Sequence, residues 1–331
     1  MQSEPTPLSP KPGRTSRLVA LGAVTSLIVL LPLWRTMSSY NYVLQVLMVI
    51  FMWIAMTSSW NILGGFTGYI SLGHNVFFAA GGYVSGLLLL EFGWSPFYTA
   101  LLAGLFSLLL GAVAGLITYR THGTSFIVST VALLLVVTLL MDNWDYLGGS
   151  NGLSLPLPPF HVSWVKVPFY YTMFAAAALA TMLGYRVAHS KFGVALRAIA
   201  ADEVKAEVSG VDTRKFKLMA FALSAFFPGV VGALWGYSLA YLRPVIFLLI
   251  AIAARMVLMA IVGGRGTVAG PVIGAALIVV LDEASITFFG SSELNLVITG
   301  AILVLMLLFF PLGIIGSLRN AGRLPAWLDW D

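Results

Sequence analysis

Residues 97–119 read FYTALLAGLFSLLLGAVAGLITY, an uncharged run of 23 residues that lies between Pro96 and Arg120. A helix needs about 20 predominantly apolar residues to cross a bilayer. Runs of this kind recur along almost the whole chain of 331 residues, of which 59% are hydrophobic and only 9% charged. Because an ordinary soluble domain carries about a quarter charged residues, the composition excludes such a domain and predicts a chain that lies in lipid.

The same pattern predicts an all-α fold, a polytopic transmembrane helical bundle of about eight to ten spans. No stretch shows the alternation of a barrel strand, and inside a bilayer only helices and closed barrels pair every backbone group. The third and ninth spans follow glycine-rich segments and are either full spans or re-entrant pieces. The ten expected spans are 18–34, 40–62, 72–90, 97–119, 125–141, 167–187, 216–239, 245–262, 268–281 and 295–315.

The basic residues indicate the orientation. With ten spans and the N-terminus inside, 14 of the 18 Lys and Arg lie inside, three lie outside and Arg255 falls within the eighth span. The positive-inside rule therefore places both ends in the cytoplasm. We expect a disordered tail at 1–17, which is rich in Pro and Ser. The tail is followed by a transmembrane domain at 18–318, which includes the inside loop 186–217. A cytoplasmic tail at 319–331 comes last.

The outside loops are expected to carry most of the remaining polar residues. The longest, 142–166, is full of turn-forming residues, and it either connects two helices or meets an extracytoplasmic partner. Another outside loop is expected to hold Asp282 and Glu283, directly after the ninth span.

Several classes of function are excluded by what the sequence lacks. The chain has no Cys and only four scattered His, so it offers no disulfide, no thiolate site and little for a metal cluster. It contains neither a G-x-x-x-x-G-K-[ST] phosphate loop nor an H-E-x-x-H motif. Its basic residues lie between apolar runs rather than in one patch, which favours membrane lipid over nucleic acid. We therefore expect no catalytic residue, no metal and no cofactor in this chain.

Glycines four residues apart recur in the expected spans. Such pairs let helix backbones approach closely in lipid, so we expect them at helix–helix contacts. The pairs are Gly82 and Gly86, Gly111 and Gly115, Gly232 and Gly236, and Gly270 and Gly274.

The inside loop 186–217 is the only long amphipathic stretch, and it holds seven of the 18 basic and four of the 13 acidic residues. We expect two short helices in it, the second capped by Asp202 and ended by Gly210. Such a pair either docks its apolar face in a groove of a cytoplasmic partner or lies among lipid headgroups. The apolar positions are Phe192, Leu196 and Ile199 in the first helix and Val204 and Val208 in the second.

Two glycine-rich segments, 64–73 and 263–274, lie beside the third and ninth spans in the two halves of the chain. Interrupted segments in corresponding positions point toward a transport path, because they free backbone groups to meet a polar solute. The alternative is that these glycines only permit tight helix crossings and turns. The candidate path residues are Gly65, Thr67, Gly68, Ser71, Gly73, His74, Asn75, Arg255, Gly263, Gly264 and Gly266.

Arg255 is the charged residue of the apolar run AIAARMVLMAIV, at 251–262. A charge at bilayer depth is costly and is usually functional or paired. Arg255 therefore binds a solute carboxylate, pairs across a dimer of such bundles, or extends its charge toward the inner surface.

Five motifs carry a family resemblance. In the inside loop, S-x-F-G-x-A-L-R-A-I begins at Ser190, E-x-x-A-E-x-x-G at Glu203 and K-F-K-L-x-A-F-x-x-S-A-F at Lys215. NILGGFTGYISLGH at 61–74 and MAIVGGRGTVAGPVIGAA at 259–276 lie on either side. In this order, over nearly the whole chain, the motifs resemble those of the LivM-type permease subunits of bacterial branched-chain amino acid ABC transporters.

The resemblance implies a multi-pass subunit of the bacterial inner membrane that pairs with a second, homologous permease of the LivH type. It also implies two cytoplasmic ATPase subunits, which carry ATP and Mg, and an extracytoplasmic solute-binding protein. The family's coupling helix carries over to Glu203, Ala206 and Gly210, with Glu207 and Arg197 beside it. The two glutamates are expected to pair with basic groups on the ATPase.

We therefore expect a permease subunit of an ATP-driven importer for branched-chain or other hydrophobic amino acids, without enzymatic activity of its own. Two alternatives remain open. The same machine can serve urea, short amides or another small polar solute. The chain can also be a non-transporting membrane scaffold or receptor, but a scaffold needs no glycine-broken spans, whereas a coupled permease needs both these and a docking helix.

Overall fold

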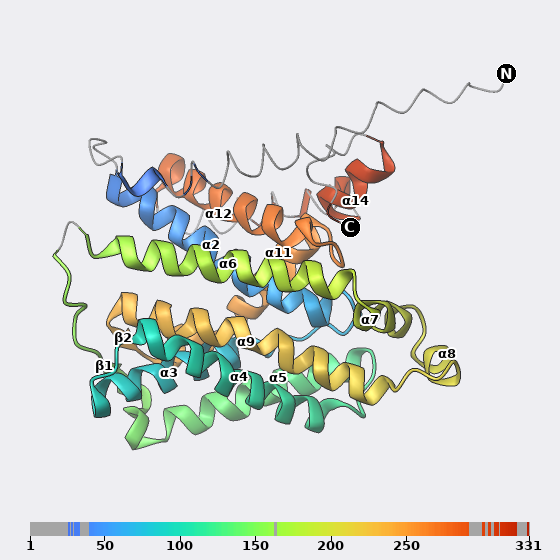
Figure 1. The fold of residues 1–331 in the computed structure, drawn as a ribbon, viewed down its shortest axis with the longest axis horizontal. Helices are drawn as coiled ribbons and strands as arrows, with labels where there is room; N and C mark the ends of the chain where they lie inside the picture. The colour runs from blue at the N-terminus through green and yellow to red at the C-terminus, as the bar shows by residue number, and fades with distance from the viewer. Residues whose placement is uncertain are drawn as a thin grey trace.

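The computed structural model describes residues 26, 28, 30–33, 40–161, 164–290, 300, 301, 304, 305, 308–310, 312–322 and 330. In this part of the chain, long helices lie roughly side by side in one bundle (Figure 1). Eight of them are long and apolar enough to cross a membrane, which confirms the all-α polytopic fold. The expected tail 1–17 and most of the expected spans 18–34 and 295–315 lie outside the described residues.

The observed helix bounds follow the distribution of apolar residues and end near Gly, Pro or polar residues. In chain order the elements are η1 (Leu31–Leu33), α2 (Tyr40–Gly64), α3 (Asn75–Phe92), α4 (Pro96–Thr118), α5 (Thr124–Asp142), η2 (Asp145–Leu147), η3 (Gly149–Asn151), β1 (Leu153–Ser154), α6 (Lys166–Ala188), α7 (Lys191–Ala201), α8 (Glu203–Val208), α9 (Thr213–Leu239), β2 (Tyr241–Leu242), α10 (Pro244–Phe247), α11 (Ile250–Gly263), α12 (Ala269–Phe289) and α14 (Gly313–Asn320).

Helix α9 lies at the centre of the bundle and packs against α2, α3, α4 and α6 (Figure 1). It begins three residues before the expected start, because the Asp212 side chain accepts a hydrogen bond from the Lys215 N–H at 3.0 Å and caps its first turn. It ends at Ala240, whose φ of 53° is left-handed. Its position gives α9 contact with both the first and the second half of the chain.

The glycine pairs lie at helix contacts, as expected. A Cβ at Gly82 would lie 3.1 Å from the carbonyl oxygen of Gly232, so these two pairs face each other across α3 and α9. A Cβ at Gly111 would lie 2.5 Å from a side-chain carbon of α9, and one at Gly274 would lie 1.9 Å from the carbonyl oxygen of Met259. Larger side chains at these positions would force the helices apart.

The eighth span differs from the expected single helix at 245–262. It is interrupted between α10 and α11, at Leu248 and Leu249. The third and ninth spans, for which full spans and re-entrant pieces were both expected alternatives, are the continuous helices α3 and α12.

The ninth span is longer than expected. Helix α12 continues to Phe289, so Asp282 and Glu283 lie within a helix and not in a loop. Each carboxylate has a partner that makes this placement favourable: Asp282 forms an ion pair with Arg255, and Glu283 accepts a hydrogen bond from the Tyr42 hydroxyl at 2.6 Å. Pairing lowers the cost of a charge near lipid.

A two-stranded antiparallel sheet lies at one end of the bundle, which we call the sheet end (Figure 1). Strands β1 and β2 are antiparallel, with Leu153 opposite Leu242, and Arg243 Nε donates to the carbonyl of Ser150 at 3.0 Å. These bonds hold the long loop 142–166 against the segment that follows α9, which is consistent with a loop that connects two helices.

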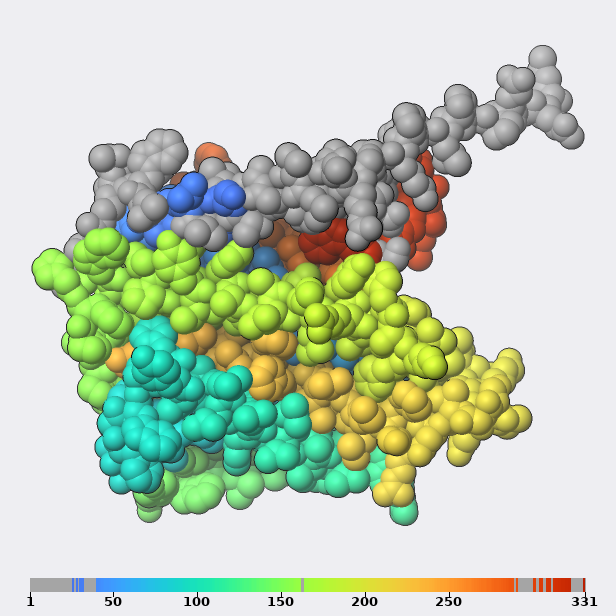
Figure 2. Space-filling model, in the orientation of Figure 1, coloured from blue at the N-terminus to red at the C-terminus, as the bar shows by residue number. Residues whose placement is uncertain are grey.

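Helices α7 and α8 lie at the opposite end, on the right in Figure 1. We call this the α8 end. In the same orientation, Figure 2 shows the yellow segment around α8 projecting beyond the other helices.

Candidate functional site

Helix α8 is short, and its flanking residues cap both of its ends. Asp202 accepts a hydrogen bond from the Lys205 backbone N–H at 3.1 Å and forms an ion pair with Lys205 Nζ at 3.2 Å. Gly210 has a φ of +91°, which favours glycine, and its N–H donates to the carbonyl of Glu207 at 2.9 Å. The expected cap at Asp202 and the expected stop at Gly210 are confirmed.

The apolar stripe of α7 faces its own bundle. Leu196 and Ile199 are buried, and Leu196 packs in a cluster with residues of α2, α3 and α9. Arg197 Nη2 donates to the carbonyl of Ala188 at 2.9 Å, which fixes α7 against the end of α6. From the sequence, this stripe was predicted to lie in a partner's groove or among lipid headgroups. Both predictions are wrong for α7, because the bundle itself covers the stripe.

The apolar stripe of α8 faces outward. Val204 is 71% exposed and Val208 is 85% exposed, whereas Ala206 between them is buried against the chain. Glu207 is also exposed. The small side chain of Ala206 lets α8 approach the bundle closely and leaves the two valines without a partner among the described residues.

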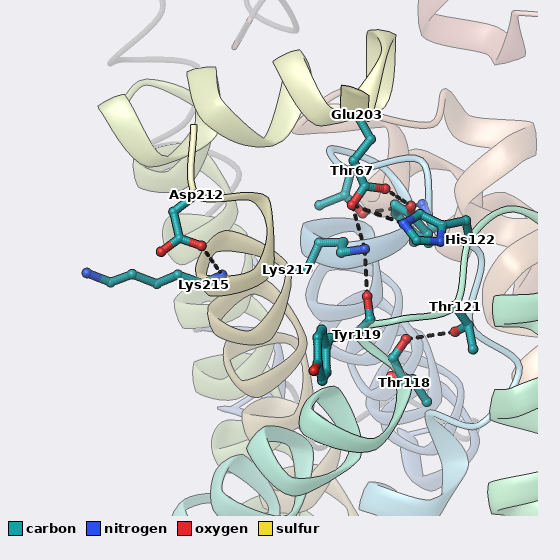
Figure 3. Close-up of polar contacts among 10 residues, drawn as sticks. Thr67, Thr118, Tyr119, Thr121, His122, Glu203, Asp212, Lys215 and Lys217 are labelled. Atoms are coloured by element: carbon teal, nitrogen blue, oxygen red, sulfur yellow. Dashed lines mark hydrogen bonds and ion pairs between the residues drawn. The ribbon is translucent and has the colours of Figure 1, made fainter. Parts of the chain in front are cut away.

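Glu203 is held inside the chain. Lys217 Nζ of α9 lies 2.7 Å from Glu203 Oε1, and His122 Nε2 lies 3.6 Å from the same oxygen (Figure 3). The Tyr69 hydroxyl donates to Oε2. We call these four residues the Glu203 cluster. The basic partner of Glu203 in the structure is Lys217 of the same chain, whereas a basic group on an ATPase was expected from the sequence.

The Glu203 cluster joins segments that lie far apart in the sequence. Tyr69 comes from the first glycine-rich segment, His122 from the α4–α5 connection, Glu203 from α8 and Lys217 from α9. Lys217 Nζ also donates to the carbonyl of Tyr119 at 3.0 Å (Figure 3). Through Glu203, α8 is therefore in direct contact with three other parts of the chain.

The protonation states within the cluster follow from its contacts. Burial alone would raise the pKa of the Glu203 carboxyl, but hydrogen bonds from Lys217 and Tyr69 and the nearby positive charge lower that pKa below its ordinary value. Burial and the bond to Glu203 raise the pKa of the Tyr69 hydroxyl. Tyr69 is thus a neutral donor to a carboxylate, which is a stronger hydrogen bond than one between neutral groups.

Asn61 of α2 joins the two glycine-rich segments. Its Nδ2 donates to the carbonyl of Thr267 at 2.9 Å, and its Oδ1 accepts from the Gly266 N–H at 3.0 Å. A Cβ at Gly266 would lie 3.2 Å from the carbonyl oxygen of Gly65. The two segments, which belong to opposite halves of the chain, therefore meet at the α8 end.

Most polar side chains of the candidate path bond to the chain itself. His74 is fully buried, and its Nδ1 and Nε2 each lie 2.9 Å from a serine Oγ, of Ser71 and Ser224 respectively. Thr67 Oγ1 donates to the carbonyl of Leu63 at 2.7 Å. In this conformation these groups stabilise the segment and are not open to a solute.

Asn75 differs from these residues. Its Nδ2 donates at 2.9 Å to the carbonyl of Leu249, at the interruption between α10 and α11. Its Oδ1 is buried and has no hydrogen-bond partner within the described part of the chain. Asn75 therefore lies beside an interrupted helix and carries a buried acceptor, Oδ1, that has no partner among the described residues.

Several glycines of the candidate path permit close backbone contact. A Cβ at Gly73 would lie 2.6 Å from the carbonyl oxygen of Thr130, and one at Gly263 would lie 1.8 Å from that of Gly270. Gly264 has a φ of +129°. These contacts are those of the alternative interpretation, in which the glycines permit tight crossings and turns.

Arg255 pairs within its own chain. Its guanidinium forms an ion pair with Asp282 of α12 and lies 5.1 Å from the centre of the Trp53 ring. Its Nε is buried without a hydrogen-bond partner among the described residues. This pair within the chain differs from the three roles expected for Arg255, which were binding of a solute carboxylate, pairing across a dimer and extension toward the inner surface.

Sequence reasoning missed Tyr69, His122 and Lys217 of the Glu203 cluster, and it missed Asn61. Tyr69 and Asn61 stand in the motif at 61–74, and Lys217 stands in the charged inside loop, so each lay in a recognised pattern without an assigned role. Within the described ranges, no group of three or more His, Cys, Asp or Glu side chains is arranged to hold a metal ion.

Comparisons with known proteins identify relatives over most of the chain. The family described as "Branched-chain amino acid transport system / permease component" matches residues 42–307. The high-affinity branched-chain amino acid transport system permease protein LivM of Escherichia coli is 26% identical, over 89% of this chain and 75% of its own length. The corresponding protein LivH of Salmonella typhimurium is 26% identical over 76% of this chain and 87% of its own length.

A third relative is archaeal. The probable branched-chain amino acid transport permease protein LivH of Methanocaldococcus jannaschii is 27% identical, over 71% of this chain and 79% of its own length. No solved structure matches the chain. Its described residues include eight helices that are long and apolar enough to cross a membrane, and the family matches most of its length. The chain therefore belongs to the permease components of branched-chain amino acid transport systems.

Proposed function

We propose that this chain is one of two homologous permease subunits of an ATP-driven importer that moves branched-chain amino acids into a bacterial cell. The α8 end faces the cytoplasm and two ATPase subunits, which carry ATP and Mg. The sheet end, with β1 and β2, faces a soluble binding protein. Support comes from the basic residues around α7 and α8 and from the similarity to both LivM and LivH proteins, which indicates a system with two permeases.

One observation carries the proposal: α8 has an outer apolar face and an inner ionic anchor. Val204 and Val208 are exposed on its outside, while Glu203 is bound to Tyr69 and Lys217 on its inside. An exposed apolar stripe on a capped helix suits the groove of a protein partner. The anchor suits transmission, because a rigid contact passes a partner's displacement on to the bundle.

The proposed mechanism follows the contacts inward. Closure of the ATPase subunits displaces α8, and Glu203 passes the displacement to Tyr69 in the first glycine-rich segment and to Lys217 in α9. Asn61 couples that segment to the second one. The two halves of the chain therefore respond together, and the solute path opens by a rocking movement of packed helices.

The solute path itself is proposed to pass near Asn75 and the interruption at Leu248 and Leu249. A broken helix inside a bundle offers backbone groups to a polar solute, and Asn75 Oδ1 adds a buried acceptor that has no partner among the described residues. Replacement of Asn75 by Leu is expected to abolish ATP-driven uptake of leucine while the folded bundle persists.

The docking proposal is tested by copurification of the ATPase subunits with Val208→Glu. Burial of one valine in an interface contributes about 1.5–3 kcal/mol, so an introduced charge is expected to reduce recovery of the ATPase at least roughly tenfold. Val194→Glu is the matched control, because Val194 is an exposed valine of the neighbouring helix α7. Full recovery of the ATPase with Val208→Glu would contradict docking through α8.

The transmission proposal is tested by Tyr69→Phe, which removes only the hydroxyl that bonds to Glu203. We expect ATPase recovery to be unchanged and the number of leucine molecules imported per ATP hydrolysed to fall several-fold in proteoliposomes. Tyr98→Phe is the control, because Tyr98 is 82% exposed and lies outside the cluster.

Uptake of urea or acetamide in place of leucine by the wild-type complex would refute the proposed solute class.

A further inference from the structure

A cavity of about 520 Å³ lies at the α8 end, beside the Glu203 cluster. Its volume is within the range of roughly 300–1,000 Å³ typical of small-molecule sites. The first glycine-rich segment, the start of α5, the end of α7 and the second glycine-rich segment form its walls. The lining side chains used below are Ile70, Ile127, Ile199, Asp202, Glu203 and Arg265.

Arg265 supplies a positive charge that the described part of the chain leaves without a carboxylate partner. Its Nη2 makes one long contact, at 3.5 Å, with the carbonyl of Gly68. Arg265 is exposed at the edge of the cavity, where desolvation by the surrounding atoms lowers the pKa of its guanidinium. A guanidinium with free donors at the edge of a cavity favours a carboxylate, which it can bind through two hydrogen bonds.

Glycine at position 68 keeps the space beside this guanidinium open. A Cβ there would lie 3.4 Å from Arg265 Nη2 and 3.7 Å from the Cβ of Ala200. Arg265 and the end of α7 thus approach Gly68 together, and a larger residue would fill the space between them.

Acidic groups lie in the same cavity. Asp202 and Glu203 follow directly after α7, and both carboxyls have pKa values below the ordinary range, so both are ionised at neutral pH. In Asp202, hydrogen bonds from Lys205 cause this shift. Each carboxylate can accept about four hydrogen bonds, so the existing bonds leave acceptor capacity for an ammonium group.

The remaining wall is aliphatic. Ile70, Ile127 and Ile199 come from three different elements and line the same space. The cavity thereby combines one cation, two anions and a branched aliphatic surface. These features complement the carboxylate, the ammonium group and the branched side chain of a zwitterionic amino acid.

We propose that this cavity is a binding site for an aliphatic α-amino acid, with Arg265 on its carboxylate, Asp202 and Glu203 on its ammonium group and the isoleucines on its side chain. The site lies beside the contact between Glu203 and Tyr69, so an amino acid bound there competes for the Glu203 carboxylate. The proposal goes beyond transport: it gives the α8 end a means to sense the solute on its own side of the membrane and to restrain further transport.

The test is equilibrium binding of radiolabelled L-leucine to the full-length chain in lipid nanodiscs, without ATPase subunits, nucleotide or binding protein. We expect saturable binding by the wild type and a Kd about tenfold higher for Arg265→Gln, because a hydrogen bond to a charged group contributes about 1.5–3 kcal/mol. Ile127→Trp, which fills the cavity, is expected to abolish binding. Arg186→Gln is the matched control, since Arg186 is an exposed arginine in the last turn of α6.

Ligands that lack one charge test the recognition of the other. 4-Methylpentanoate lacks the ammonium group and 3-methylbutylamine lacks the carboxylate, and each is expected to bind at least tenfold more weakly than leucine. Equal binding of 4-methylpentanoate and leucine would overturn the zwitterion site in favour of an anion site.

Absence of leucine binding by the wild type, or binding unchanged in both Arg265→Gln and Ile127→Trp, would overturn the proposal altogether. Thermal unfolding of each variant shows whether it is folded. Because no ATPase is present, failure of this proposal is distinguishable from failure of ATP coupling.

Discussion

Lys217 Nζ of α9 lies 2.7 Å from Glu203 Oε1 of α8, and the two side chains are only 7% and 14% exposed. Removal of one member of a buried pair leaves the other charge without compensation, which costs about 3–5 kcal/mol. We therefore expect Lys217→Met to lower the thermal unfolding temperature of the purified chain more than Glu203→Gln does. In Glu203→Gln, an amide still accepts from Tyr69.

The double variant Glu203→Gln/Lys217→Met is the control for this pair. It removes both charges, so most of the stability lost in Lys217→Met should return. A double variant whose loss equals the sum of the two single losses would show that the pair is not coupled.

Acid is expected to weaken the same contact. The pKa of folded Glu203 lies below its ordinary value of 4.5, so its contribution to stability is fully present above that value and is lost as the pH falls through the folded pKa. The difference in unfolding temperature between wild type and Glu203→Gln should be constant from about pH 8 to 6 and should shrink below about pH 4.5. The same titration of His122→Gln separates the effect of the neighbouring imidazole, and a difference that grows with acid would refute the assignment.

The pair between Arg255 and Asp282 gives a prediction for the contact between α11 and α12. Arg255→Leu leaves the Asp282 carboxylate without its partner, and an unpaired charge in a membrane helix costs about 2.5–3.5 kcal/mol. Both folded yield and leucine uptake should fall. The double variant Arg255→Leu/Asp282→Leu should recover the yield. Recovery of yield without uptake would assign the pair to transport, and recovery of both would make it purely structural.

Close contact between α3 and α9 gives a prediction about packing. A Cβ at Gly232 would lie 1.9 Å from the carbonyl oxygen of Phe78, and overpacking of this kind costs about 1–3 kcal/mol. Gly232→Ala should therefore lower the unfolding temperature. Gly184→Ala is the control, because nothing lies within 4 Å of a Cβ at that position in α6. Equal stability of the two variants would contradict the contact.

The fold was largely predictable because apolar length and charge are local properties. Those properties predicted α2 to α6 and α9 closely. They failed at α12, because Asp282 and Glu283 read as polar loop residues until their partners Arg255 and Tyr42 are known. Those partners belong to other helices, and no pattern within the segment indicates them.

The candidate site divides in the same way. The caps at Asp202 and Gly210 depend on neighbouring residues and were predicted correctly. The hydrogen bond from Tyr69 to Glu203 was not predicted, because the two residues lie 134 positions apart. The amphipathic spacing of α7 and α8 also gave no means to tell which stripe faces the bundle, since that depends on the bond of Arg197 to the end of α6.

The amide of Asn61 has a geometric consequence. It bonds to two adjacent residues, Gly266 and Thr267, through both of its ends, and two such bonds from one planar group define an axis. Sliding of the second glycine-rich segment along α2 would break both bonds at once. One side chain of α2 thus fixes the position of the second glycine-rich segment at the α8 end, by holding two adjacent backbone groups of that segment at once.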